Sequence, residues 1–112
     1  MNVVFVTRDL MLGSRVQGAA RSLEVDLKVS AGLPAADSLQ EAPPDRILID
    51  LQSVDDGLKD WVESILDLHP NCQLVAYAPH VQTQRLDMAR EAGIATVLTR
   101  GQFDRSMNDL LR

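Results

Sequence analysis

The sequence predicts a doubly wound α/β domain with a five-stranded parallel sheet. Five short runs rich in Val, Ile and Leu alternate with longer stretches in which apolar residues recur at helical spacing, and the connections are short. Because parallel strands are joined by helical crossovers, this alternation places helices on both faces of the sheet. At 112 residues, the chain is expected to form one domain, residues 1–112.

The first two units precede Pro43-Pro44. Residues 3–6 are predicted as the first strand, and a stretch of helical period follows it. Residues 27–31 are predicted as the second strand. A first helical turn tolerates proline, so a weak helix is expected from Pro34 to Leu39, and it must end before the proline pair.

Three further units follow the proline pair. Residues 47–49 form an apolar run without alternation, as expected for a strand covered on both faces. Residues 74–78 and 95–99 are predicted as the fourth and fifth strands. The helix between them stops at Gly93, a residue that favours the left-handed conformation at a helix C-terminus. The third helix is marked by Leu58, Val62 and Ile65 with Trp61 and Leu68, and the last amphipathic helix by Phe103, Met107 and Leu110.

Composition and charge exclude several classes of function. The net charge is −5 and no cluster of Lys and Arg occurs, so direct nucleic-acid binding is not expected. Cys72 is the only cysteine, which excludes an internal disulfide and a metal site of several thiolates. The apolar N-terminus lacks a preceding basic segment and is interrupted by Arg8 and Asp9, so neither a signal peptide nor a membrane span is predicted. A cytoplasmic protein is expected.

Functional residues are expected where the strands end, because ligands of open α/β sheets bind beyond the carboxyl ends of the strands. The residues at those positions are Thr7-Arg8-Asp9, Asp50, Ala78-Pro79-His80 and Thr99-Arg100-Gly101.

Two of these stretches carry a resemblance to a known family. ILIDL, residues 47–51, and AREAGIATVLTRGQF, residues 89–103, resemble the receiver domain of two-component response regulators (the CheY-like superfamily), and the resemblance extends over essentially the whole chain. It implies a flavodoxin-like (βα)5 fold with strand order 2-1-3-4-5. In that family an aspartate at the end of the third strand accepts a phosphoryl group, and Mg²⁺ neutralises the phosphoryl oxygens. Asp50 holds the matching position.

The other family positions differ in this sequence. Receivers carry an acidic pair after the first strand, where this chain has Thr7-Arg8; Asp9 lies one position beyond and could hold metal with Asp50 only through water. The Ser or Thr that ends the fourth strand is replaced by Ala78, or by Tyr77 if the register slips by one. Arg100 replaces the lysine that follows the fifth strand and keeps its charge.

The sequence therefore predicts an atypical receiver, or pseudo-receiver: a non-enzymatic signalling module without a cofactor. Asp50 is expected to be a structural carboxylate held by Arg8 or Arg100, and Asp55 or Asp56 to cap the third helix. The first alternative is a phospho-accepting switch at Asp50, which would require Mg²⁺ and present the phosphoryl group to these arginines. The second is a nucleotide or flavin binder, against which stand the absence of a Gly-rich loop after Val6 and the low aromatic content of 4%.

The resemblance also implies a docking surface made by the fourth helix, the fifth strand and the last helix. A basic surface on an acidic protein would attract an acidic partner or a second copy of the chain. The residues expected on it are His80, Arg85, Arg90, Arg100, Phe103 and Arg105. Whether the chain is a whole protein or a fragment is left open.

Overall fold

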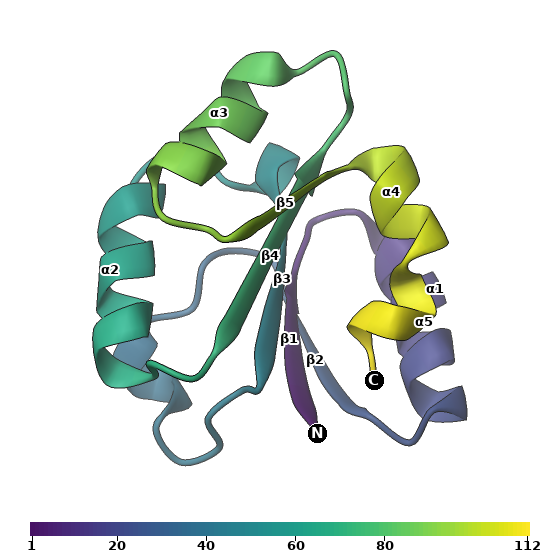
Figure 1. Cartoon of the computed structure of the whole chain (residues 1–112). Helices are drawn as coiled ribbons and strands as arrows, with labels where there is room; N and C mark the ends of the chain where they lie inside the picture. The colour runs from purple at the N-terminus through teal and green to yellow at the C-terminus, as the bar shows by residue number, and fades with distance from the viewer.

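The computed structural model describes residues 1–112 and contains one five-stranded parallel sheet (Figure 1). The strand order is β2-β1-β3-β4-β5, which confirms the predicted fold. The strands are β1 Asn2–Val6, β2 Asp26–Ser30, β3 Arg46–Asp50, β4 Gln73–Ala78 and β5 Thr96–Thr99. The helices are α1 Leu10–Ser22, α2 Leu58–Leu68, α3 Thr83–Glu91, α4 Arg100–Arg105 and α5 Met107–Leu110, with short 3-10 helices η1 Ala36–Leu39 and η2 Leu51–Ser53.

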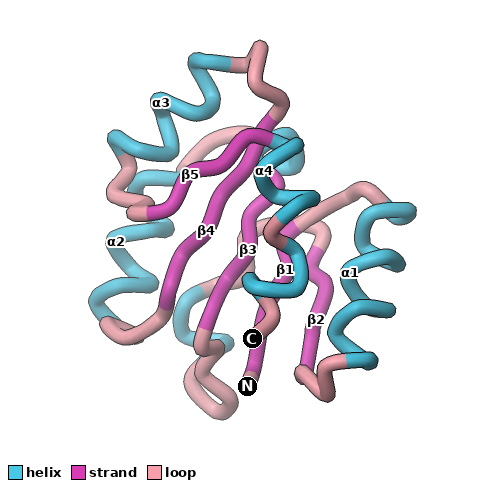
Figure 2. Tube along the Cα trace, turned by 45° about the vertical axis from the view of Figure 1, so that its right-hand side comes forward, coloured by secondary structure: helices cyan, strands magenta, loops and turns pink.

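Helices cover both faces of the sheet, with α2 and α3 on one face and α1, α4 and α5 on the other (Figures 1 and 2). Alternate residues of each strand point to opposite faces. In β3, Ile47 and Ile49 therefore pack under α2 and α3, whereas Leu48 packs under α1 and α4. Asp50 follows the same alternation and lies on the side of Leu48.

The second unit contains only the 3-10 turn η1, and the predicted helix from Pro34 to Leu39 was wrong in type. The backbone hydrogen bonds span three residues, as in a 3-10 turn: the Ser38 N–H donates to the carbonyl of Ala35 at 3.0 Å, and the Gln40 N–H to that of Asp37 at 3.4 Å. The Ser38 hydroxyl also donates to the Ala35 carbonyl, which competes with the bonding of an α-helix. The turn is held from outside, because Trp61 Nε1 donates a hydrogen bond to the carbonyl of Pro34 at 2.6 Å. His69 Nε2 lies 3.1 Å from the carbonyl oxygen of Ala36.

The structure also tests the helix ends that were predicted from the sequence. Gly57 is the N-cap of α2 with φ of 76°, so neither Asp55 nor Asp56 caps this helix. The turn after β3 needs a left-handed residue at that point, which glycine adopts readily. Gly93 follows α3 with φ of 101°, as predicted. The single last helix expected from the sequence is broken at Ser106 into α4 and α5.

No helix of the chain combines the length and the hydropathy that a membrane crossing requires.

Candidate functional site

The carboxylate of Asp50 lies at the carboxyl end of β3, between the ends of β1 and β4, and is 5% exposed. Its Oδ2 atom accepts a hydrogen bond from Thr7 Oγ1 at 2.8 Å and a longer one from Ser53 Oγ at 3.3 Å. Its Oδ1 atom accepts from the backbone N–H of Gln52 at 3.1 Å and so caps η2. Both oxygens of this buried carboxylate therefore have donors within the protein.

The two hydroxyls that hold Asp50 are themselves oriented by the loop after β1. Thr7 Oγ1 accepts the N–H of Asp9 at 3.0 Å, and Ser53 Oγ accepts the N–H of Arg8 at 2.9 Å. A hydroxyl has a single proton, so each can accept from the backbone and donate that proton to Asp50. The result is a closed network that links the ends of β1 and β3.

Neither arginine pairs with Asp50, so the predicted ion pair was wrong. Arg8 Nη2 lies 3.7 Å from Asp55 Oδ2, and its Nε donates to the carbonyl of Ala31 at 3.2 Å. Arg100 Nε lies 3.3 Å from Asp104 Oδ1, one helical turn along α4. The physical reason is solvation: short hydroxyls satisfy the buried carboxylate, whereas burying a guanidinium beside it would cost desolvation energy.

The donor set around Asp50 does not fit Mg²⁺, the metal that the receiver fold implies. This ion prefers carboxylate and water oxygens in octahedral arrangement. The acidic pair is replaced by Thr7 and Arg8, and the Asp9 carboxylate caps α1 by accepting the N–H of Leu12 at 3.0 Å. No group of three or more His, Cys, Asp and Glu side chains is placed to hold an ion.

Tyr77, rather than Ala78, lies beside Asp50. The β3–β4 register pairs these two residues directly, and their side chains share the α1 face of the sheet. Ala78 points into the opposite core beneath α3. The Tyr77 ring stacks on Phe103 with a centroid distance of 4.0 Å. Its hydroxyl is buried near Thr7 but forms no hydrogen bond of normal geometry. Burial, followed by the charge of Asp50, raises the pKa of this phenol, and the nearby Thr7 hydroxyl opposes that rise.

The predicted docking surface contains fewer free basic groups than the sequence indicates. Phe103 is completely buried, so its placement on that surface was wrong. Arg85 Nη1 turns toward the loop after β3 and donates to the carbonyl of Leu51 at 2.8 Å. Arg90 and Arg100 each pair with a carboxylate of their own helix. His80 and Arg105 are exposed, and neither forms an ion pair.

Four highly exposed apolar side chains were missed by the sequence reasoning. Leu10 and Met11, in the first turn of α1, are 87% and 81% exposed. Val81 and Met88, before and within α3, are 73% and 54% exposed. For the α1 pair the sequence held a signal, because Leu10 and Met11 lie off the apolar stripe that Leu12 and Val16 set.

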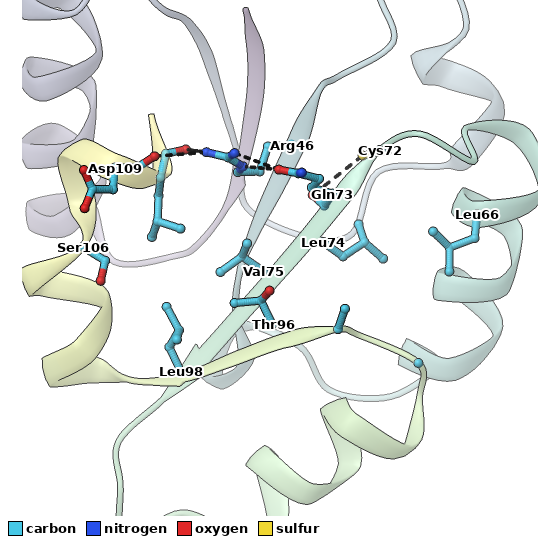
Figure 3. Close-up of a pocket in the computed structure, with 13 residues that line it drawn as sticks. Arg46, Leu66, Cys72, Gln73, Leu74, Val75, Thr96, Leu98, Ser106 and Asp109 are labelled. Carbon is cyan, nitrogen blue, oxygen red and sulfur yellow. Dashed lines mark hydrogen bonds between the residues drawn. The ribbon is translucent and has the colours of Figure 1, made fainter. Parts of the chain in front are cut away.

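A hollow of about 580 Å³ lies away from Asp50, beside the amino-terminal half of β4 (Figure 3). Arg46 crosses it, donating to Gln73 Oε1 at 2.7 and 3.0 Å and to the backbone carbonyl of Leu110. Its guanidinium thus joins α5 to the sheet and is not free for a ligand. Cys72 lines the same hollow, and burial, with a contribution from Asp45, raises the pKa of its thiol to about 11.

No protein-family model matches this sequence, and no curated protein matches it. Solved receiver structures do match the fold. NtrX from Brucella abortus aligns with 98% of the chain at 15% identity and a TM-score of 0.73, but the chain spans only 26% of that protein. The beryllofluoride-activated NtrC4 receiver domain dimer aligns with 98% of the chain at 14% identity and a TM-score of 0.74, and 95% of it is covered.

HP1043, an orphan response regulator of H. pylori, aligns with 99% of the chain at 16% identity and a TM-score of 0.73, and 90% of it is covered. These likenesses confirm the resemblance at the level of the fold: the chain has the CheY-like receiver fold.

Proposed function

We propose that this chain is a non-enzymatic regulatory module that has kept the receiver fold and acts by binding another protein or a second copy of itself. The observation that carries the proposal is the state of the Asp50 carboxylate. Both of its oxygens accept hydrogen bonds from the protein, and Thr7 stands where a metal-binding carboxylate would be needed. In this arrangement the role of Asp50 is to link the end of β3 to the end of β1.

Phosphorylation would have to dismantle this network. A phosphoryl group on Oδ2 would displace the Thr7 and Ser53 hydroxyls. Its added negative charge would need a neutralising metal, but the carboxylate that follows β1, Asp9, already caps α1. Both hydroxyls also accept backbone N–H groups, so the loop after β1 would lose its anchor. These costs favour a structural Asp50.

The test is the response of backbone amide NMR signals to Mg²⁺ and then to beryllofluoride, which mimics an aspartyl phosphoryl group. We expect no saturable shifts at Asp50, Arg8 or Arg100. Arg8→Asp is the matched variant, because it restores a carboxylate beside the site and removes the cation. Saturable shifts in the wild-type protein would overturn the proposal.

One observation favours the phospho-accepting alternative. The positive charge of Arg100 opposes the rise in the pKa of Tyr77, the residue that pairs with Asp50 across β3 and β4. A cation is therefore near the end of the sheet where a phosphoryl group on Asp50 would lie. In that case Arg8→Asp should strengthen Mg²⁺ binding, measured by titration calorimetry, and no gain would count against a phospho-switch. A nucleotide or flavin has less support, since the hollow beside Arg8 and Ser53 is only about 150 Å³.

A further inference from the structure

A groove runs between the start of α2 and the end of α3, on the face of the molecule opposite α1. Figure 1 shows the last turn of α3 above the first turn of α2. Two adjoining hollows of about 270 and 400 Å³ share Asp55, Asp56, Leu58 and Met88 among their lining residues. We call this feature the α2–α3 groove. Its lining residues do not include Asp50, Thr7 or Ser53.

The floor of the α2–α3 groove is apolar. Leu51, Val54 and Leu58 are buried core residues whose outer surfaces line it. Met88 forms one wall and is 54% exposed, although it projects from a helix whose other apolar side chains are buried. A flexible thioether that remains in water at the edge of an apolar floor is suited to adapt to an inserted side chain.

The rim of the groove is acidic. Four carboxylates lie along it: Asp55, Asp56, Asp60 and Glu91. Only Asp55 has an ion pair, a long and exposed one with Arg8. The carbonyl end of α3 adds partial negative charge next to Glu91.

The cations that line the groove are too few to balance this rim. Arg85 is engaged by the carbonyls of Leu51 and Val54, and Lys59 is the other basic residue. Four carboxylates therefore face two cations, one of which is already bound. Such a charge pattern attracts a basic partner and repels an acidic one.

We propose that the α2–α3 groove binds a basic amphipathic helix of another protein, which inserts an apolar side chain against Met88 and Leu58 and sets Lys or Arg against the acidic rim. This proposal deepens the binding role proposed above and rests on it. The sequence predicts a basic surface that attracts an acidic partner, whereas the α2–α3 groove is an acidic surface that attracts a basic partner.

The test uses a helical peptide of about 14 residues built from Leu-Lys-Lys-Leu repeats, long enough to present one apolar face. The chain has four methionines, so methyl-labelled methionine reports on four sites in one spectrum. Addition of the peptide should shift the Met88 methyl signal saturably. Met11, which is more exposed and lies on α1, is the internal control and should not shift.

The matched variants separate the groove from the overall charge. Asp56→Lys with Glu91→Lys reverses two charges on the rim, whereas Asp26→Lys with Asp109→Lys reverses two exposed charges elsewhere. We expect the rim variant to weaken peptide binding at least about fivefold and the control variant less than about twofold. An amide spectrum of each double variant, compared with that of the wild-type protein, verifies that both are folded.

Three results would overturn the proposal. Equal weakening in both variants would show attraction by net charge alone. A shift at Met11 in place of Met88 would place the peptide on α1. A Met88 shift that depends on protein concentration without peptide would identify a second copy as the occupant. None of these depends on the beryllofluoride response, so failure here and failure of the proposed role of Asp50 are distinguishable.

Discussion

Replacing Thr7 by valine tests whether the hydroxyl network holds Asp50. Valine has nearly the same shape as threonine, so the substitution removes the hydroxyl without opening a cavity. The lost bond to Asp50 is short, at 2.8 Å, and joins two buried side chains, and the bond from the Asp9 N–H is lost as well. A buried hydrogen bond to a charged group contributes roughly 1.5–3 kcal/mol.

We therefore expect Thr7→Val to lower the free energy of unfolding by about 2–3 kcal/mol. With a urea slope of about 1–2 kcal/mol/M, typical of a small domain, the unfolding midpoint should fall by at least about 1 M. Thr7→Ser keeps the hydroxyl and is the control. A cycle with Asp50→Asn then isolates the coupling between the two side chains.

If Thr7→Val unfolds at the same urea concentration as the wild-type protein, the Thr7 hydroxyl does not stabilise the fold. If the loss of stability is the same in the Asp50→Asn background, the hydroxyl acts independently of the carboxylate.

Three further predictions concern Tyr77, Arg46 and Cys72. Tyr77→Phe removes a buried hydroxyl that forms no hydrogen bond of normal geometry, so the free energy of unfolding should stay the same or rise by up to about 1 kcal/mol. Tyr77→Leu loses the ring that stacks on Phe103 and should lower the free energy of unfolding; thermal unfolding of the two variants measures the difference. Arg46→Met should release α5, seen as faster amide hydrogen exchange at Leu110 with little change in the sheet. Because the pKa of Cys72 is raised from 9.0 to about 11, the folded state favours the neutral thiol, and stability should fall as pH rises from about 9 to about 11, less steeply in Cys72→Val.

The strands were predictable because their signal is local. The runs around Phe5, Ile47 and Val75 are dense in β-branched and large apolar residues, and each is bounded by polar residues or turn formers. The break at Ser106 was not predictable, because the apolar spacing of Phe103, Met107 and Leu110 continues through it.

The predictions for Arg8, Arg100 and Phe103 failed because the sequence does not show in which direction a side chain extends. Arg8 and Arg100 follow strands that end at the same edge of the sheet as Asp50, but their long side chains extend to other carboxylates. These are Asp55 and Asp104, which are more exposed than Asp50, so the charged groups stay in contact with water. Phe103 was assigned to the surface because its position in the family pattern does not show which way α4 turns. Packing on Tyr77 decides that direction.

The receiver fold, the strand order and the position of Asp50 at the end of β3 could be predicted from the amino-acid pattern, because they follow from the period of the apolar residues and from a resemblance to a known family. The partners of the Asp50 carboxylate could not, because they depend on contacts between distant segments. Thr7 lies 43 positions away in the chain, and its hydroxyl becomes a partner only when β1 and β3 pair in register. The α2–α3 groove has the same origin, since its apolar floor and acidic rim come from segments that meet only in the folded molecule.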